Sequence, residues 1–448
     1  MPCDPEQLRA LYADHIDHLA ARCGDALTAR GLDALVISAG SLAPRSRFDD
    51  QDWPFRPTPA FGHWVPLREP GGVIIVKPGA TPRLVRALVS GFWDAPPRVE
   101  SHHIWGEFEV CETALDDVKA EIPSLARAAF IGDDPARAHA WGFANEAINP
   151  DDLVASLHAI RARKTGYELA CLREANRVAS LGHVRLSEAF FASNRSELEL
   201  HLDYLEATEQ DDCDTPYKNI VATNENAATL HHVVYDRARR TATGGSLLVD
   251  AGATCLGYAS DITRTWVKGE SAGASAFAEL IRRVDGIQRQ LVAQVAPGVA
   301  YEALHDRAHE LLADVLRDLD IVRADPGAIV ESGATRAFFP HGLGHSLGIQ
   351  VHDVGLCPRP PRPENAFLRN TAELAPGHVV TIEPGCYFIS SLLDELRGRP
   401  IAADVDWTVI DALRPYGGVR VEDDVAVIEA GAENLSRPAL EEAGVPTA

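Results

Sequence analysis

The stretch Leu248-Val-Asp250-Ala-Gly-Ala-Thr-Cys-Leu-Gly-Tyr-Ala-Ser-Asp261 is the part of this sequence that says most about its fold. It holds two aspartates eleven positions apart, one at the end of an apolar strand and one within the next expected strand. A hairpin-like reversal through residues 251–257 can bring both carboxylates to one point. Because aspartates at strand ends are also common caps and turn formers, this stretch alone leaves a metal site and a structural role open.

A second stretch, further along the chain, concentrates histidines. The segment His341-Gly-Leu-Gly-His345-Ser-Leu-Gly-Ile-Gln-Val-His352 has three histidines within twelve residues, separated by glycines. Glycine lets backbones approach closely and leaves room for a ligand. The Gly-Leu-Gly piece does not complete a dinucleotide-binding pattern, and no P-loop lysine follows it. The segment therefore favours a site built from imidazoles over a phosphate-binding loop.

Two glutamates stand inside or at the end of apolar strands, in Val379-Val-Thr-Ile-Glu383 and in Arg420-Val-Glu422. A buried carboxylate costs several kcal/mol unless it is paired or bound to a metal. Surface exposure would explain each glutamate alone. Two glutamates, two aspartates and a histidine within one domain together predict a metal site.

The composition of the whole chain sets limits on its class. Of 448 residues, 46% are hydrophobic and 24% are charged, which is typical of a globular protein of two or three domains. The net charge of 42 − 65 = −23 argues against nucleic acid and anionic membrane surfaces as partners, because the protein repels phosphate groups. No apolar run reaches the length of a membrane span, and the N-terminus lacks the pattern of a signal peptide.

The cysteines indicate the cellular compartment of the protein. Eight of them are dispersed along the chain without a CxxC pair. In a long chain without a signal peptide, this pattern predicts reduced core residues and a cytoplasmic location.

The N-terminal part of the chain is expected to be an α/β domain. Helical periodicity covers residues 5–30, and short apolar runs bounded by Gly, Asp or Pro predict strands at 34–38, 73–76 and 129–131. Residues 45–59 are rich in Asp, Pro and aromatic side chains and show no period. They predict a long loop, and long loops in compact domains are often functional.

A domain boundary is expected just before a helix that begins near Thr165, whose spacing to Glu168 is that of a capping box. We therefore expect domains at 1–160 and 161–448. The second domain should contain helices near 275–294 and 301–318. Its expected strands are 247–250, 258–267, 378–382 and 419–428. Few βαβ alternations are visible, so this domain is expected to be α+β with an antiparallel sheet.

The four ligand-rich segments, in this order, resemble those of the pita-bread metallopeptidases, the family of methionine aminopeptidase, aminopeptidase P and prolidase. The resemblance implies an α/β N-terminal domain followed by an α+β pita-bread (creatinase/aminopeptidase-like) catalytic domain. The five metal ligands of that family are matched by type at Asp250, Asp261, His345, Glu383 and Glu422. Creatinase shares the fold but lacks these ligands and uses no metal, so their presence implies a metal-dependent hydrolase.

Within this family the sequence is most similar to the bacterial Xaa-Pro dipeptidases (prolidases), whose near relatives include organophosphorus acid anhydrolase. The likeness extends over nearly the whole chain and implies a substrate-facing role for Asp50, in the segment Phe48–Phe55, and for Tyr217 and Leu230. It also implies that Arg369, fourteen residues before Glu383, binds the substrate carboxylate.

Three residues depart from the pattern of that group. Lys218 stands where glycine is expected, and His232 and Val233 replace residues of Tyr-Thr type. These departures bear on substrate preference and leave the metal ligands intact.

The ligand set implies two divalent metal ions that share Asp261 and Glu422, with a bridging hydroxide as the nucleophile. Oxygen-rich ligation favours Mn²⁺, with Co²⁺ or Zn²⁺ able to substitute. Glu383 is the expected general base. The hydrogen-bond donors expected for the scissile carbonyl and the developing oxyanion are His231, His341 and His352.

Arg420 has two readings at this point. It either orients the metal-binding carboxylates or serves as an ion-pair partner of Asp423 or Asp424.

The activity implied is hydrolysis of Xaa-Pro dipeptides, with organophosphate triesters as a possible side substrate. The resemblance also implies a homodimer in which the N-terminal domain of one subunit reaches the cleft of the other. Two alternatives are an aminopeptidase P that acts on longer peptides and a non-catalytic, peptide-binding pita-bread domain. The intact ligand set argues against the second alternative.

Overall fold

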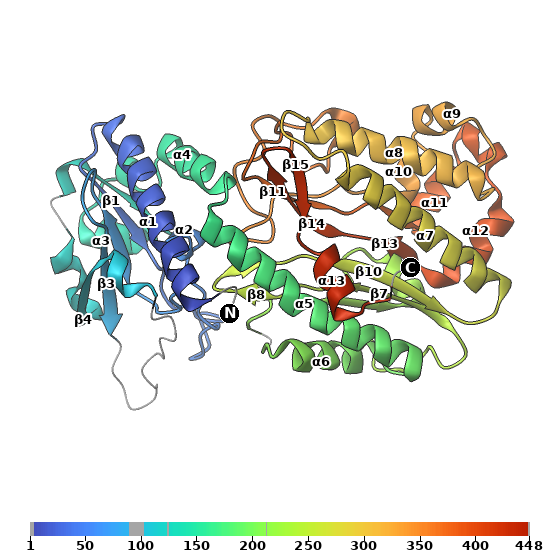
Figure 1. The fold of residues 1–448 in the computed structure, drawn as a ribbon, viewed down its shortest axis with the longest axis horizontal. Helices are drawn as coiled ribbons and strands as arrows, with labels where there is room; N and C mark the ends of the chain where they lie inside the picture. Colours follow the sequence, from blue (N-terminus) through green and yellow to red (C-terminus); the bar gives the residue numbers. More distant parts are fainter. Residues whose placement is uncertain (1–3, 89–102, 123–124, 212, 447–448) are drawn as a thin grey trace. The chain divides into compact units, whose positions relative to one another are not determined.

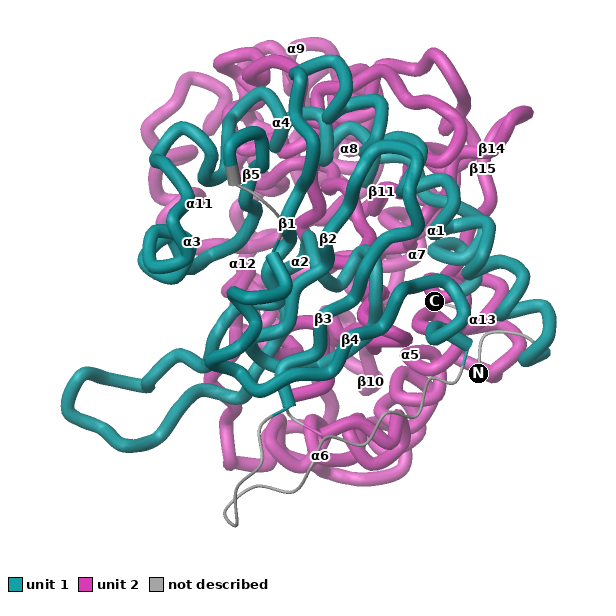
Figure 2. The backbone as a smooth tube through the Cα atoms, turned by 90° about the vertical axis from the view of Figure 1, so that its left-hand side faces the viewer, with its two compact units in different colours: residues 1–170 teal, residues 171–448 magenta. Residues whose placement is uncertain are grey.

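The computed structural model describes residues 4–88, 103–122, 125–211 and 213–446. The chain forms two compact units, residues 1–170 and 171–448 (Figure 2). Their boundary falls within helix α5 (Gly166–Ala192). Among the described residues, no helix is both long enough and apolar enough to cross a membrane.

Unit 1 is built on a five-stranded mixed sheet in the order β4-β3-β2-β1-β5 (Figure 1). The β1–β5 and β3–β4 pairs are parallel, and the β1–β2 and β2–β3 pairs are antiparallel. The strands are β1 (Ala34–Ser38), β2 (Val73–Val76), β3 (Arg83–Leu88), β4 (Glu109–Ala114) and β5 (Ala128–Ile131). The helices of the unit are α1 (Pro5–Thr28), α2 (Pro59–Gly62), α3 (Pro135–Trp141) and α4 (Asp151–Ala162).

Both faces of the central strands are buried, which explains their continuous apolar runs. Alternate residues of a strand point to opposite faces, so Val36 packs with Trp141 of α3 on one face. On the other face Ile37 and Cys23 of α1 line one small cavity. The structure thus confirms the expected first helix and first two strands, and the α/β character of this domain.

Unit 2 combines antiparallel sheets with helices, as expected for an α+β domain. Its sheets have the orders β10-β7-β6, β11-β14-β15, β12-β13 and β8-β9. The strands are β6 (Ile220–Thr223), β7 (Gly245–Asp250), β8 (Thr254–Cys255), β9 (Tyr258–Ala259), β10 (Thr263–Lys268), β11 (Val379–Ile382), β12 (Gly385–Tyr387), β13 (Gly418–Arg420), β14 (Asp423–Ile428) and β15 (Gly431–Asn434).

The helices of unit 2 surround these sheets. Besides α5 they are α6 (Glu197–Thr208), α7 (Ala272–Val292), α8 (Tyr301–Asp318), α9 (Pro326–Glu331), α10 (Thr335–Phe338), α11 (Ser390–Arg397), α12 (Trp407–Leu413) and α13 (Arg437–Ala443). In Figure 1, α6 lies below strands β7 and β10, and α8 lies above them. The long helices α7 and α8 were expected from the sequence at nearly these bounds.

The register of β7 decides which side chains reach the interior of unit 2. Leu247 and Val249 pack with residues of α5 and α6 in one apolar cluster, while Leu248 belongs to a second cluster. Because side chains alternate along a strand, Asp250 points to the same face as Leu248, away from α5 and α6. The sheet therefore directs this carboxylate toward the inside of the unit.

Candidate metal centre and active-site cleft

Two aspartates come from the β7–β10 hairpin region. Asp250 is the last residue of β7 and lies opposite Thr263 in the antiparallel ladder with β10. Asp261 precedes β10, and its amide donates to a carboxylate oxygen of Asp424 at 3.0 Å. Tyr217 joins the two, because its hydroxyl lies within hydrogen-bonding distance of both Asp250 Oδ1, at 2.7 Å, and Asp261 Oδ1, at 2.5 Å.

Glu422 comes from the link between β13 and β14. Its backbone forms an isolated antiparallel bridge with Thr263. The Thr263 hydroxyl donates to Glu422 Oε2 at 2.6 Å. This contact holds the glutamate beside the end of β7 where Asp250 stands.

His345 and Glu383 are held by the junction between the histidine-rich loop and β11. The Thr381 amide donates to the His345 carbonyl at 2.9 Å, and the Glu383 amide donates to the Leu343 carbonyl at 2.9 Å. Gly344, with φ of 153°, sits so close that a Cβ there would collide with Thr381. The glycine between the histidines therefore permits this close approach.

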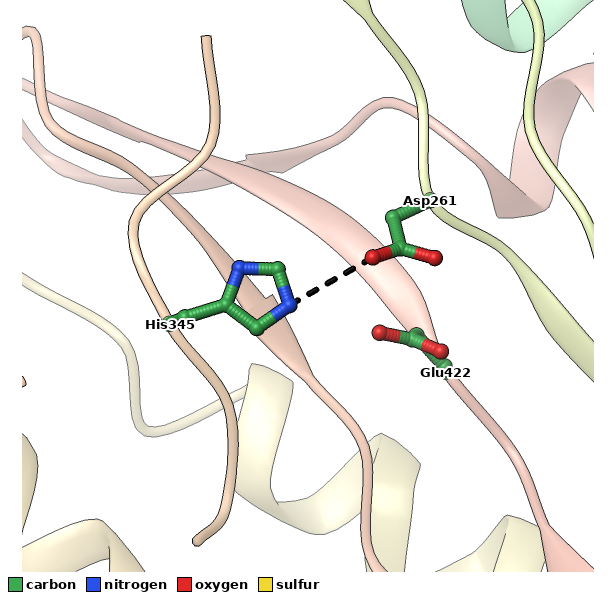
Figure 3. Close-up of side chains that lie close together, drawn as sticks. All are labelled: Asp261, His345 and Glu422. Carbon is green, nitrogen blue, oxygen red and sulfur yellow. Dashed lines mark ion pairs between the residues drawn. The ribbon is translucent and has the colours of Figure 1, made fainter. Parts of the chain in front are cut away.

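Asp261, His345 and Glu422 form the centre of the site. One ligand atom from each lies within 4.8 Å of the others, and all three side chains are buried. Figure 3 shows the three side chains pointing toward one another, with the His345 Nε2–Asp261 Oδ2 ion pair at 3.4 Å drawn as a dashed line. Glu383 is close by, with its Oε1 3.7 Å from His345 Nε2.

A cleft of about 760 Å³ opens onto this centre. All five expected metal ligands line it, and so do other residues singled out from the sequence. The expected site residues that line the cleft are Leu230, His231, Asp250, Asp261, His341, His345, His352, Arg369, Glu383, Arg420 and Glu422.

Two expected substrate residues do not line the cleft. Tyr217 contacts the cleft residues Asp250 and Asp261 through its hydroxyl. Asp50 is an exposed residue of unit 1, whereas the residues that line the cleft all belong to unit 2.

Crowding of buried carboxylates dominates the electrostatics. Burial, followed by the charge of Asp250, raises the pKa of Asp261. Burial and the charges of Asp261 and Glu383 hold the pKa of Glu422 well above its usual range. Burial also raises the pKa of Glu383 to about 7, although His345 and Arg420 oppose this shift.

His345 is the cationic partner of this cluster. Burial disfavours its charged form, but the hydrogen bond and the charge of Asp261 outweigh burial and raise its pKa to about 9. Its Nδ1 lies 3.0 Å from the Ser346 carbonyl, to which only an N–H can donate. The Nε2 atom is thereby directed at Asp261 and Glu383.

These residues fit divalent metal ions. Four carboxylates and one imidazole carry a formal charge of −4, and the raised pKa values of Asp261, Glu383 and Glu422 indicate that the cluster favours added positive charge. The carbonyl bonded to His345 Nδ1 fixes the tautomer that a metal-binding Nε2 requires. Oxygen donors with one imidazole suit hard or borderline cations.

Arg420 contacts a predicted metal ligand directly. Its Nη2 donates to Asp250 Oδ2 at 2.6 Å, and burial of the guanidinium is offset by Tyr387, Asp250 and Glu422, so its pKa stays well above its usual range. The sequence left two roles open for Arg420, and the structure shows that Arg420 contacts Asp250 of the carboxylate cluster. Asp423 pairs instead with Arg264 at 2.5 Å and with Arg437 at 3.1 Å.

Tyr387, which the sequence analysis did not single out, connects Arg420 to His341. Its hydroxyl accepts from Arg420 Nη1 at 2.9 Å and lies 2.9 Å from His341 Nε2. His341 Nδ1 donates to the Gly342 carbonyl at 2.8 Å, so Nε2 accepts from the tyrosine. Burial, then Arg420, lowers the pKa of His341 to about 3 and keeps it neutral. No local signal marks Tyr387, because it meets Arg420 only through the β12–β13 pairing.

Comparisons with known proteins agree with this geometry. A family model described as metallopeptidase family M24 matches residues 170–429, and one described as the Xaa-Pro dipeptidase N-terminal domain matches residues 10–159. The Xaa-Pro dipeptidase of Pseudoalteromonas atlantica is 40% identical over 443 residues, covering 96% of this chain and 99% of the relative. That of Shewanella amazonensis is 41% identical over 442 residues, with 96% and 99% covered.

A solved structure supports the fold. Aminopeptidase P from Escherichia coli with the inhibitor Pro-Leu superposes with a TM-score of 0.73 at 23% identity, covering 96% of this chain and 97% of that one. At this identity the likeness concerns the fold alone.

The two-unit fold and the carboxylate-rich cleft define a metal-dependent peptidase. The chain belongs to metallopeptidase family M24, and its relatives over nearly its whole length are the Xaa-Pro dipeptidases of that family.

Proposed function

We propose that this protein hydrolyses Xaa-Pro dipeptides in the cleft of unit 2. One observation carries the proposal: the cluster of Asp261, His345 and Glu422 opens into a cleft that Arg369 also lines. The cleft thus combines a metal-binding cluster with the permanent positive charge of Arg369. This combination matches a substrate that has a scissile carbonyl and a free carboxylate. The names of the full-length relatives support the same substrate class.

Two divalent cations are proposed as cofactors, with Mn²⁺ first and Co²⁺ or Zn²⁺ as substitutes. The residues proposed to hold them are Asp250, Asp261, His345, Glu383 and Glu422. When bound, such ions polarise carbonyl oxygens and lower the pKa of water to near neutrality. Arg420 holds Asp250 in place through its 2.6 Å contact, and Tyr217 holds Asp250 and Asp261 together.

Glu383 is proposed as the residue that takes a proton from the attacking water. Burial raises its pKa to about 7 in the metal-free site, and bound cations would favour the ionised carboxylate that a proton acceptor requires. His231 and His352 are the proposed donors to the developing oxyanion, each typically worth about 3–4 kcal/mol in the transition state. His341 is kept as a cleft residue, but both of its ring nitrogens are engaged, so we propose that it holds Tyr387.

The proposed chemistry is compatible with a bond before proline, while the preference for proline rests on the resemblance to the Xaa-Pro dipeptidases. An Xaa-Pro bond has no amide hydrogen, so a peptidase that grips the substrate N–H fails on it. Polarising the carbonyl requires no such contact. Arg369 is proposed to bind the proline carboxylate through two parallel hydrogen bonds, which would confine the enzyme to dipeptides.

The competing activity is that of aminopeptidase P, the name carried by the solved structure of similar fold. Mn²⁺-dependent hydrolysis of Ala-Pro and of Ala-Pro-Ala separates the two. We expect cleavage of the dipeptide and little cleavage of the tripeptide. Faster cleavage of the tripeptide would favour aminopeptidase P, and no cleavage of either would favour a non-catalytic peptide-binding protein. Phosphotriester hydrolysis is proposed as a side activity.

Assembly and location are also proposals. We propose a homodimer in which the loop around Asp50 of one subunit reaches the cleft of its partner. Residues 1–160 would supply that loop and residues 161–448 the chemistry. A cytoplasmic location is supported by the free thiols of Cys23, Cys111, Cys255, Cys357 and Cys386, although only Cys23 and Cys386 among these five are buried.

A further inference from the structure

Glu197, the first residue of α6, is an unusual carboxylate. Its side chain is fully buried and accepts five hydrogen bonds. Three reach Oε1: the Thr223 amide at 2.8 Å, the Thr223 hydroxyl at 3.0 Å and Asn226 Nδ2 at 2.8 Å. Two reach Oε2: His232 Nε2 at 2.6 Å and the Asp236 amide at 2.7 Å. A buried charge this well satisfied rigidifies the groups that donate to it.

All five donors belong to residues 223–236, which connect β6 to the loop before β7. This segment carries Leu230 and His231, which line the cleft. His231 is itself exposed. Its neighbour His232 donates to Glu197. The direction of His231 is therefore set by the backbone that Glu197 holds.

A second contact one helical turn along α6 holds the same segment. His201 stacks on the Tyr235 ring with centroids 4.5 Å apart, and Lys218 Nζ lies 5.0 Å from the centroid of that ring. The Tyr235 hydroxyl donates to the Asn219 carbonyl at 2.6 Å. Glu197 and His201 are four residues apart and so share one face of the helix. Lys218 and His232 both depart from the dipeptidase pattern. Lys218 contacts Tyr235 and His232 contacts Glu197, so both belong to the set of contacts that holds residues 223–236.

We propose that Glu197 is a positioning residue that orients His231 in the cleft, and that His232 is its link to that loop. The inference rests on the proposed function, because His231 is assigned there as a donor to the oxyanion. Glu197 touches no substrate. It acts by restricting residues 223–236, and a donor displaced by about 1 Å can cost about a hundred-fold in rate.

The test begins with His232, because its removal leaves four of the five hydrogen bonds to Glu197 in place. H232L should lower kcat on Ala-Pro by about ten- to a hundred-fold with KM little changed, since misalignment affects the transition state more than binding. H232Q keeps a donor and should restore most of the rate. E206Q, at an exposed carboxylate of the same helix, is the matched control. Bound metal per subunit should equal that of the wild type in all three.

A double-mutant cycle decides whether the effect runs through His231. In an H231A background, H232L should cost less than about three-fold, because two changes in one chain of contacts are not additive. Equal costs with and without His231, or loss of bound metal in H232L, would overturn the proposal.

Amide hydrogen exchange tests whether Glu197 anchors residues 223–236, and it needs no activity assay. E197Q and H232L should speed exchange in residues 223–236 and leave β7 unchanged. Unchanged exchange would overturn the anchoring. If the wild-type enzyme cleaves no Xaa-Pro dipeptide, the proposed function fails, while this exchange result still decides what Glu197 does.

Discussion

At the scale of single residues, the main feature of the cleft is the close packing of several carboxylates with few positive charges. Asp261, Glu383 and Glu422 lie together in a buried cluster, and burial and mutual repulsion raise the pKa of each. Beside them, Asp250 forms an ion pair with Arg420, whose Nη2 lies 2.6 Å from Asp250 Oδ2. Uncompensated buried carboxylates are costly, so the cluster is arranged for divalent cations rather than for structural stability.

The first prediction concerns the two acidic residues nearest the centre. D261N and E422Q keep the size of each side chain but remove the negative charge of a carboxylate that is proposed to hold the metal ions. Metal ions supply several kcal/mol of transition-state stabilisation, so kcat/KM on Ala-Pro should fall by about a thousand-fold or more. Metal analysis of the purified variants should show less bound metal than the wild type. Wild-type activity in a variant that binds no metal would contradict the assignment.

The second prediction concerns Arg369. Loss of a charge-assisted pair in a cleft costs about 2–5 kcal/mol, so R369A should lower kcat/KM on Xaa-Pro dipeptides by roughly thirty- to several-thousand-fold. A phosphotriester has no carboxylate, so its hydrolysis should change much less. R369K keeps the charge without the planar fork and should fall between wild type and R369A. Equal losses on both substrates would point instead to damage at the metal centre.

Residue types in the sequence indicated a metal site, and the resemblance to the family singled out its five ligands, but neither identified the residues that support them. The structure brings Asp250, Asp261, His345, Glu383 and Glu422 to one cleft. Supporting groups such as Thr263 and Tyr387 were not found. They carry no local signature, because each meets the site only through strand pairing.

At the scale of elements, two strands expected to be continuous are interrupted at candidate ligands. The expected strand 258–267 is divided into β9 and β10 around Asp261, and 419–428 is divided into β13 and β14 around Glu422. The Asp261 amide donates to the side chain of Asp424 instead of to a neighbouring strand, and Glu422 keeps only an isolated bridge to Thr263. Apolar patterning predicts a strand but does not show where a carboxylate competes for its amides.

Other elements were missed because their patterns are weak. β4 is partly exposed along its length and contains two glutamates, so neither alternation nor an apolar run marks it. α6 begins with a Ser196–Glu199 capping box that the sequence displays, yet its anchoring role depends on residues 223–236. The long loop near 45–59 was found, because it lacks any period.

The third prediction belongs to that loop. Phe48 is 90% exposed and Trp53 58% exposed, an unusual presentation of large apolar side chains. If they contact a second subunit, W53A should raise the dimer dissociation constant by about thirty-fold or more, as loss of a central interface aromatic does. Sedimentation velocity over a concentration series measures this. L202A, at a 55% exposed leucine of α6, serves as the control. A fully active wild-type monomer would contradict the proposed assembly.

At the scale of the whole molecule, buried histidines couple stability to pH. Burial lowers the pKa of His15, His183 and His305 to about 4 and that of His309 to about 2. The folded chain therefore excludes protons that the unfolded chain binds below its ordinary imidazole pKa of 6.5. Each such histidine removes up to about 1.4 kcal/mol of stability per pH unit between about pH 6.5 and its folded pKa. Stability should fall as the pH drops through this window.

The fourth prediction isolates one of these histidines. His305 is 3% exposed, lies on α8, and its Nδ1 has no hydrogen-bond partner among the described residues. Between pH 7 and pH 5, the wild type should lose about 2 kcal/mol more unfolding free energy than H305Q, because the unfolded wild-type chain gains one proton that the folded chain refuses. Urea unfolding at both pH values, with the metal concentration fixed, measures the difference. Bound metal stabilises both proteins alike, so its pH dependence cancels.

L312A is the control, because it removes a buried apolar group from the same helix without removing a titrating group. Its loss of unfolding free energy relative to the wild type should be the same at both pH values. If H305Q lost as much stability on acidification as the wild type, the folded protein would have to accommodate a proton on His305, and acid sensitivity would lie in the carboxylates instead.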